Sequence, residues 1–338
     1  MSKLGLDKAQ YQNLHIGLNP DGRFLVDNSA LASWYGCTTA GVLRYLHGLT
    51  NAEESANLKA GSACHSAREY YLKTDNLEGA LECLDSEYKE WAGQHVVADD
   101  RLAWSNVRTI VGEYLKSLEP LGEGKYRGSV LAYPDPEQVE IAFCLPLDEA
   151  AQIYFCGRLD GLGDYGRDGL HYAIEEFKTT GMANAAWAKK WKLGSQITGY
   201  LWAARQLADK PVVGAFVQGL ELSALPSDPT RKCSKHGQKY SECRLLHAKW
   251  ETVGLLERPQ GMIDGWFADA LEAATKMRKL AETTTLDDVQ NMAQEGMFNG
   301  TCSQFNSTCQ FAGACEMGRA AHLIQANYKV ERWSPFKD

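Results

Sequence analysis

Hydrophobic residues recur with two different periods along this chain, and the change of period marks its organisation. In the first third they return every third or fourth position, which is typical of amphipathic helices. This spacing predicts helices over residues 29–49, 59–72, 77–91 and 99–118. From residue 139 onward they alternate at every second position, which is typical of strands. The alternation predicts strands over residues 139–147, 152–162 and 170–179.

The remainder of the chain returns to helical spacing, with one further strand. We predict a helix over 184–207, a strand over 211–222, a polar loop over 225–241 and helices over 256–280 and 286–294. This order predicts an α/β fold in which a small mixed sheet is flanked by helices. We divide the chain into a helical amino-terminal region (1–130), a core sheet (131–225) and a polar loop with closing helices (226–338). The three parts are expected to pack as one integrated domain.

The composition is typical of a globular protein of the cell interior. The 338 residues are 44% hydrophobic and 23% charged. Neither a signal peptide nor an apolar run of membrane-spanning length is recognisable, so we expect an intracellular protein without a membrane partner. The net charge of −8 argues against a uniformly basic nucleic-acid-binding coat, although a metal-assisted cleft needs only local positive potential.

Two carboxylates and a lysine are spaced so that they converge on one edge of the predicted sheet. Asp160 lies near the end of one predicted strand, and Glu176 and Lys178 lie two residues apart on the next. Side chains at positions i and i+2 of a strand point to the same face, so Glu176 and Lys178 project together. Carboxylate oxygens beside an ammonium group suit binding of a divalent metal and activation of water, as phosphodiester hydrolysis requires. The pattern therefore favours a nuclease-like site.

A glycine-rich segment directly after Asp160 has two interpretations. Residues 161–166 match the GxGxxG pattern of dinucleotide-binding loops, which requires a helix immediately afterwards. The residues that follow alternate as a strand instead. We therefore expect the glycines to form a hairpin turn that brings Asp160 beside Glu176.

Further polar residues lie near these positions in the predicted fold. His65 lies on the second predicted helix, where a partly buried helix histidine is the ordinary interpretation. Gln196 and Tyr200 are four residues apart, so they share one helix face, where they could contact phosphate or a base. Tyr200 could equally belong to the core.

The densest basic stretch of the chain lies shortly after the predicted Glu-x-Lys strand. It contains Lys189, Lys190 and Lys192. A solvated helix face and the wall of a DNA channel are both compatible with this spacing.

Taken in order, these residues resemble the RecB-like branch of the PD-(D/E)XK nuclease superfamily. In that branch a helix-borne histidine, a Gly-x-x-Asp strand end, a Glu-x-Lys strand and a Gln-x-x-x-Tyr helix follow one another. The matching residues of this chain are His65, Asp160, Glu176 with Lys178, and Gln196 with Tyr200. The resemblance spans residues 29–315, and Glu140 resembles an auxiliary acidic position of the branch.

The resemblance implies a restriction-endonuclease-like core and a Mg²⁺- or Mn²⁺-dependent DNA exonuclease. It implies metal ligation by His65, Asp160 and Glu176, with Lys178 orienting the attacking water. Single-stranded DNA ends are the expected substrate, in recombination, repair or phage DNA processing, with a helicase or recombination protein as partner. The expected location is the cytoplasm of a bacterial or phage-infected cell. Two alternatives are a nuclease of CRISPR adaptation and a non-catalytic nucleic-acid-binding subunit.

A second part of the resemblance concerns cysteine. Iron–sulfur members of the branch take one thiolate from an amino-terminal Ser-x-Leu…Cys segment and three from a carboxy-terminal group. The corresponding residues here are Cys37, Cys302, Cys309 and Cys315. Six and then five residues separate the last three, where the usual spacing is two and then five. The resemblance implies a [4Fe–4S] cluster, and unligated thiols are the alternative.

The predicted polar loop contains another group of metal-ligand types. Cys233, His236, Cys243 and His247 are suited to zinc, but the two pairs are close together for a zinc finger. A flexible polar loop over the cleft is the default interpretation.

Overall fold

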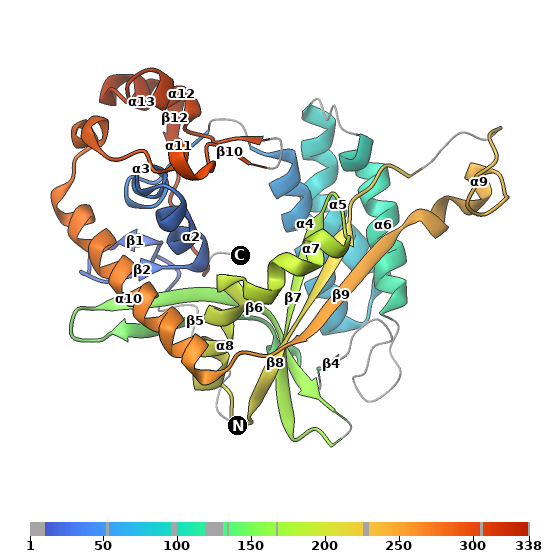
Figure 1. Cartoon of the computed structure of the whole chain (residues 1–338). Helices are drawn as coiled ribbons and strands as arrows, with labels where there is room; N and C mark the ends of the chain where they lie inside the picture. Colours follow the sequence, from blue (N-terminus) through green and yellow to red (C-terminus); the bar gives the residue numbers. More distant parts are fainter. Residues whose placement is uncertain are drawn as a thin grey trace.

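The computed structural model describes residues 11–51, 54–95, 100–118, 131–133, 135–166, 168–225, 230–304 and 307–336. It is an α/β fold with a mixed, open sheet flanked by helices (Figure 1). Eight strands form the sheet, in the order β1-β2-β6-β7-β8-β9, with β4 and β5 also paired to β6. Neighbours are antiparallel except for β2 with β6 and β7 with β8, which run parallel.

The main elements have the following bounds. The strands of the sheet are β1 (Gly17–Leu18), β2 (Phe24–Val26), β4 (Leu131–Ala132), β5 (Val139–Asp148), β6 (Ile153–Tyr165), β7 (His171–Thr180), β8 (Val212–Glu221) and β9 (Lys249–Leu256). The longer helices are α2 (Asn28–Gly36), α4 (Ala56–Thr74), α5 (Leu77–Gln94), α6 (Trp104–Ser117), α8 (Ser195–Leu207) and α10 (Gln260–Thr283). Shorter helices are α3 (Thr38–Gly41), η1 (Val42–Leu46), η2 (Asp100–Leu102), η3 (Pro136–Gln138), α7 (Ala185–Lys190), η4 (Trp191–Leu193), α9 (Tyr240–Cys243), η5 (Arg244–His247), η6 (Asp287–Asn291), α11 (Gly296–Asn299), α12 (Ala312–Glu316) and α13 (Ala321–Asn327).

The sheet divides where β6 and β7 separate. The two strands pair from the turn at Tyr165 and His171 only as far as Gly161 and Glu175. Beyond that point β6 continues with β5 and β2, whereas β7 continues with β8. The two halves splay apart in Figure 1, and α4 contacts both β5 and β7. A cleft in the sheet is thereby lined by two strand ends and one helix.

Alternation of side chains along β7 divides the core between the two faces of the sheet. Ala173 and Phe177 pack with the buried residues of α4, α5 and α6, whereas Ile174 packs with those of α8 and α10. Glu176 and Lys178 have the opposite parity to Phe177, so they face the side covered by α8. The helices therefore fix which side of the sheet receives the charged residues.

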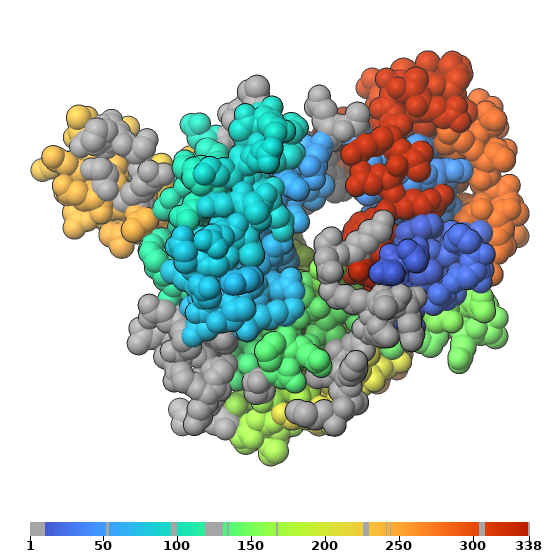
Figure 2. Space-filling view, turned by 180° about the vertical axis from the view of Figure 1, so that it is seen from behind, coloured from blue at the N-terminus to red at the C-terminus, as the bar shows by residue number. Residues whose placement is uncertain are grey.

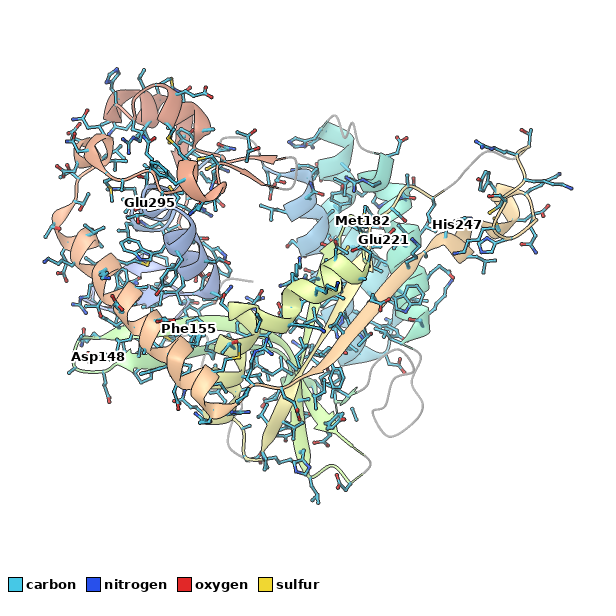
Figure 3. The ribbon with its side chains drawn as sticks, in the orientation of Figure 1. Asp148, Phe155, Met182, Glu221, His247 and Glu295 are labelled. Carbon is cyan, nitrogen blue, oxygen red and sulfur yellow. The ribbon has the colours of Figure 1, made fainter. Side chains whose placement is uncertain are left out.

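The carboxy-terminal segment returns to the amino-terminal helices. Strand β12 (Tyr328–Val330) pairs antiparallel with β3 (Leu49–Asn51), and the short hairpin β10 (Ser303–Gln304) and β11 (Ser307–Thr308) lies in the same region. Glu295, labelled in Figure 3, accepts hydrogen bonds from the backbone N–H and the hydroxyl of Thr38, both at 3.1 Å. These contacts join segments more than 250 residues apart in the sequence, at the end of α2.

The predicted strands of the core are confirmed, but several predictions about other elements are wrong, among them the helix 286–294, of which only η6 forms. The predicted helix 184–207 is interrupted at Gly194, and the predicted helix 29–49 is interrupted at Cys37. A strand, β9, occupies residues that the sequence pattern had left between a loop and a helix. Most β9 side chains are exposed or half-buried, as expected of an edge strand, so no apolar alternation marks it.

The glycine segment after Asp160 is also not the turn that we predicted. Gly161 and Gly163 lie inside β6, and the turn begins only at Gly166, which has a φ of 86°. A Cβ atom on Gly161 would lie 2.5 Å from the hydroxyl oxygen of Tyr133. Glycine is required here because the segment before β5 crosses close to the strand. The hairpin still brings β6 and β7 together, but the paired part of the two strands includes Gly161 and Gly163 and is longer than we predicted.

Among the described helices, none has the length and apolar character required to span a bilayer.

Candidate active site

Asp160, Glu176 and Lys178 lie together at the point where the sheet divides. Asp160 is the first residue of β6 beyond the last β6–β7 pair, and its Oδ2 atom accepts a hydrogen bond of 2.6 Å from the backbone N–H of Phe177. Glu176 Oε1 forms an ion pair with Lys178 Nζ. Glu176 is 1% exposed and Asp160 is 6% exposed. The two carboxylates predicted to converge therefore line one cavity, and both are largely buried.

Two further residues reach this cleft from neighbouring elements. His65, on α4, places its Nδ1 atom 3.6 Å from Asp160 Oδ1 and 3.7 Å from Glu140 Oε1. One ligand atom from each of the three residues lies within 4.8 Å of the others. The pairing of β5 with β6 skips Glu140 and Asp160, which would otherwise lie opposite each other. Glu140 has a φ of 57°, a left-handed conformation that is uncommon for glutamate. Such conformations concentrate at functional sites, where neighbouring structure holds them.

The Gln-x-x-x-Tyr pair of α8 borders the same cleft. Gln196 Nε2 donates a hydrogen bond of 2.8 Å to Glu176 Oε1. Tyr200 lines the cavity and packs edge-on against Phe143, with ring centroids 5.9 Å apart. Gln196 therefore holds a carboxylate and also lines the cavity, and its predicted contact with DNA stays a prediction. Tyr200 belongs to both the core and the cavity wall.

The concentration of acidic groups disfavours a further negative charge in the cleft. Burial raises the pKa of Glu176 to about 7, with a further increase from Asp160 that the neighbouring Lys178 opposes. Burial also raises the pKa of Glu140. Burial lowers the pKa of His65, but the carboxylates of Asp160 and Glu140 outweigh this effect and raise it above the usual value. A divalent cation would relieve the repulsion between these carboxylates.

The donor set fits a hard divalent ion. Glu176 Oε2 is buried and has no hydrogen-bond partner, which is rare for a carboxylate oxygen in a folded protein. Carboxylate oxygens with one imidazole suit Mg²⁺ or Mn²⁺. One ligand atom each of His65, Glu140 and Asp160 could reach a shared ion, whereas Glu176 lies outside this 4.8 Å group and borders the same cavity.

The cleft is one of three neighbouring cavities along α4. The cavity lined by Asp160, Glu176 and Lys178 has a volume of about 710 Å³. It shares Ser62, His65 and Lys178 with a second cavity of about 430 Å³. The second shares Leu58 with a third of about 1010 Å³. On this side, Figure 2 shows an opening between the α4–α5 helices and the carboxy-terminal residues drawn in red.

A buried polar network on the other face of β7 was missed by sequence reasoning. Glu175 is fully buried, forms an ion pair with Arg68 and accepts a hydrogen bond of 2.6 Å from Tyr133. Arg68 Nε also donates to the hydroxyl of Tyr114 at 3.1 Å. Because Arg68 and His65 are three residues apart on α4, this network fixes the helix that carries the histidine. The His-x-x-Arg spacing was the available signal.

The three lysines of the basic stretch lie beside the cleft but do not line it. Lys189, Lys190 and Lys192 are exposed on α7 and η4, and none of them borders the three cavities. Lys190 lies over the ring of Trp191, with its ammonium 4.7 Å from the centroid. Partial burial and the charge of Lys178 lower the pKa of Lys190. Of the three, Lys190 is therefore close enough to Lys178 for the two charges to interact.

The four cysteines assigned to an iron–sulfur cluster line one cavity. Cys37, Cys302, Cys309 and Cys315 all border the cavity of about 1010 Å³. No three of their sulfur atoms lie within 4.8 Å of one another, so they are not arranged around a single ion. A Cβ atom on Gly296 would lie 3.1 Å from Cys302 Sγ and 3.4 Å from Cys37 Cβ, so the backbone of α11 lies tightly against these thiols. Four soft donors around one space fit a polynuclear cluster.

No protein-family model matches the chain, and no curated protein matches its sequence. The site must therefore be interpreted from its own geometry.

Proposed function

We propose that this protein is a Mg²⁺- or Mn²⁺-dependent DNA exonuclease with a RecB-like PD-(D/E)XK active site. The observation that carries the proposal is the convergence of Asp160, Glu176 and Lys178 where the sheet divides, with a buried Glu176 oxygen that lacks a partner. An acid and an amine arranged only for stability would satisfy each other completely. Here one oxygen remains available to a ligand.

Each residue has a distinct role in the proposed hydrolysis. When bound by His65, Asp160 and Glu176, the metal supplies Lewis-acid stabilisation of charge on the scissile phosphate. Lys178 orients the attacking water and offsets the charge that develops on the phosphate oxygens. Gln196 holds the Glu176 carboxylate in position by its 2.8 Å hydrogen bond. Water attacks phosphorus directly, the bond to the leaving oxygen breaks, and no covalent enzyme intermediate forms.

The cavities along α4 favour a single strand as the substrate. Successive cavities share lining residues, and basic residues line them at several points: Lys59, Arg101, Arg44 and Lys329. The catalytic cavity itself is acidic, so phosphate enters it only with its metal. A strand that follows these cavities would reach the cysteine-lined cavity, where the proposed [4Fe–4S] cluster joins the two ends of the chain. Its role would be structural or redox-sensing.

The deciding experiment uses purified protein and end-labelled DNA. We expect single-stranded DNA to be degraded with Mg²⁺ or Mn²⁺, degradation to stop with EDTA, and activity to return when Mg²⁺ is added in excess. Glu176→Gln and Lys178→Ala should abolish degradation. The matched controls are Glu272→Gln and Lys276→Ala, because these residues form an exposed ion pair on α10. Wild-type rates in the Glu176 variant, with folding intact, would refute the proposal.

A further inference from the structure

The loop between β8 and β9 ends in a small lobe that is separate from the proposed active site. We call residues 230–248 the knuckle. It lies at the far end of β9 in Figure 1, and Figure 2, seen from behind, also shows it standing away from the body of the molecule. His247, labelled in Figure 3, belongs to it.

The knuckle has almost nothing apolar inside it. Among the knuckle side chains that the structure describes, the buried ones are Cys233 and Cys243, which are 2% and 0% exposed. Its two leucines, Leu245 and Leu246, are 47% and 59% exposed. A lobe this small cannot be stabilised by hydrophobic burial when its leucines face outward, and small domains of this kind usually need a disulfide or a metal. Both cysteines are free thiols.

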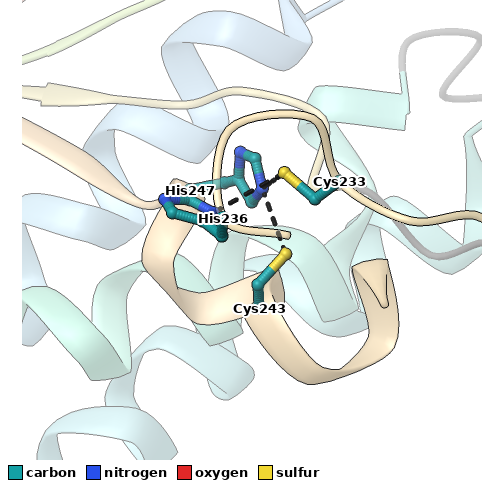
Figure 4. A group of neighbouring side chains, drawn as sticks. All are labelled: Cys233, His236, Cys243 and His247. Carbon is teal, nitrogen blue, oxygen red and sulfur yellow. Dashed lines mark hydrogen bonds between the residues drawn. The ribbon is translucent and has the colours of Figure 1, made fainter. Parts of the chain in front are cut away.

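Two local structures bring four metal-ligand side chains to one point (Figure 4). A tight turn, with Gly237 N–H bonded to Cys233 C=O at 2.8 Å and Gly237 at a φ of 70°, places Cys233 beside His236. Cys243 and His247 are four residues apart along α9 and η5, so they lie on one face of a helical segment. The turn and the helical segment supply one pair of ligands each.

The distances match those around a zinc ion. Cys233 Sγ lies 3.6 Å from His236 Nδ1 and 3.5 Å from His247 Nε2, and Cys243 Sγ lies 3.5 Å from His247 Nε2. All four ligand atoms lie within 4.8 Å of one another. Tetrahedral zinc, with Zn–S bonds of about 2.3 Å and Zn–N bonds of about 2.05 Å, holds sulfur and nitrogen ligands about 3.6 Å apart. A thiol has one hydrogen, yet Cys233 Sγ lies at this distance from both histidines. A shared zinc ion therefore explains the arrangement better than S–H···N hydrogen bonds do.

We propose that Cys233, His236, Cys243 and His247 form a structural Zn²⁺ site that folds the knuckle. All four tetrahedral positions are taken by protein ligands, so the site leaves no place for substrate or water. Metal binding would supply the stability that the missing apolar core does not. The sequence separation between the pairs is short, but the turn and the helical segment compensate for it.

Zinc content tests this site without reference to nuclease activity. We expect one zinc per chain by elemental analysis of protein from zinc-supplemented culture, reduced to background in Cys243→Ser and His247→Ala. His247→Cys, which keeps a ligand, should retain zinc. Cys83→Ser and Cys302→Ser should retain it too, since neither residue belongs to the knuckle. Replacement by Co²⁺ should give the visible bands of a tetrahedral site in the wild type and not in Cys243→Ser. Wild-type protein without zinc, or zinc retained by Cys243→Ser, would refute the proposal.

The charge of the knuckle carries a second inference, which rests on the proposed function. The chain has a net charge of −8, yet the knuckle contains five basic residues and one acidic residue, Glu242. The basic residues are Arg231, Lys232, Lys235, Lys239 and Arg244. The knuckle leaves the sheet next to Thr180, at the end of the strand that carries the catalytic lysine, because Thr180 pairs with Glu221. We infer that the folded knuckle binds the phosphate backbone of DNA that extends from the active site.

Binding measurements separate this role from catalysis. In a Glu176→Gln background, fluorescence anisotropy with labelled DNA should show that Lys235→Glu/Lys239→Glu weakens binding about tenfold and makes its salt dependence less steep. Both lysines are exposed, and the control Lys276→Glu/Lys279→Glu changes two exposed lysines of α10. Unchanged affinity in the knuckle variant, or an equal loss in the control, would refute this role. If the protein binds DNA through the knuckle but wild type does not cut it, the proposed function fails and the knuckle inference stands.

Discussion

The two candidate metal sites of this chain depend on the rest of the fold in opposite ways. The active site is assembled from α4, β5, β6 and β7, which are held in place by two hydrophobic clusters and the Arg68–Glu175 network. The knuckle is one short segment whose buried side chains are themselves the ligands. The first site has a scaffold that positions charges which repel one another, whereas the second has ligands but no scaffold. Loss of metal should therefore cost catalysis at the first site and local folding at the second.

The largest expected effect is the loss of catalysis when the active site loses a carboxylate. Asp160→Asn and Glu176→Gln should each reduce the rate of DNA hydrolysis by on the order of 10³-fold or more, because the metal and the developing charge lose a ligand. Far-ultraviolet circular dichroism should remain that of the wild type, since the scaffold does not need the metal. A variant that unfolds instead would show that the two sites do not differ in the proposed way.

The next largest effect should be confined to the knuckle. In Cys243→Ser, backbone amides of residues 231–249 should exchange with solvent at least about 10²-fold faster than in the wild type, because local opening no longer requires release of zinc. Amides of β7 should keep their protection. The measurement is hydrogen–deuterium exchange followed by mass spectrometry. Loss of protection throughout the sheet would mean that the knuckle supports the core after all.

A smaller effect should appear in the pH dependence of stability at the active site without metal. Because burial raises the pKa of Glu176 to about 7, protonated Glu176 is favoured in the folded state, whereas in the unfolded chain the carboxyl ionises near its ordinary pKa of 4.5. The stabilising contribution is thus complete below about pH 4.5 and is lost as the pH rises through about 7. Relative to Glu176→Gln, the metal-free wild type should lose about 1–3 kcal/mol of unfolding free energy between about pH 5 and pH 8.

Denaturant unfolding in buffer freed of divalent ions by a chelating resin measures this difference. Addition of Mg²⁺ at about pH 8 should restore stability to the wild type only, because the ion binds the folded state of the intact site. If the difference in unfolding free energy between the two proteins stayed constant across this pH range, the pKa of Glu176 would not be raised in the folded state.

The sequence predicts a region well when that region depends on neighbouring residues, and poorly when it depends on contacts between residues far apart in the sequence. The meander β5–β6–β7 was predicted because its residues alternate against a buried face, a signal that each strand carries by itself. Asp160, Glu176 and Lys178 were placed together by the same alternation. The division of the sheet, and the left-handed Glu140 beside it, depend on which strand β6 and β7 pair with next, which no local pattern encodes.

The knuckle failed to be predicted for a different reason. Its ligands are visible in the sequence, but their convergence depends on a turn at Gly237 and on a helical segment too short to show periodicity. Spacing rules for zinc sites assume longer separations between the pairs. The scarcity of apolar residues between β8 and β9 was the remaining sequence feature that indicated a metal site, because a lobe without a core needs another source of stability.

The smallest expected effect concerns Gln196, which tests whether the scaffold positions the carboxylate. Gln196→Ala removes the 2.8 Å hydrogen bond to Glu176 Oε1. Lys178 is then the remaining described side-chain partner of Glu176. Loss of one positioning hydrogen bond should lower kcat about tenfold with little change in KM, since the bond orients a metal ligand and does not contact DNA. Gln206→Ala, on the exposed side of the same helix, is the control. A rise in KM with kcat unchanged would instead assign Gln196 to substrate binding, as the resemblance to RecB-like nucleases first suggested.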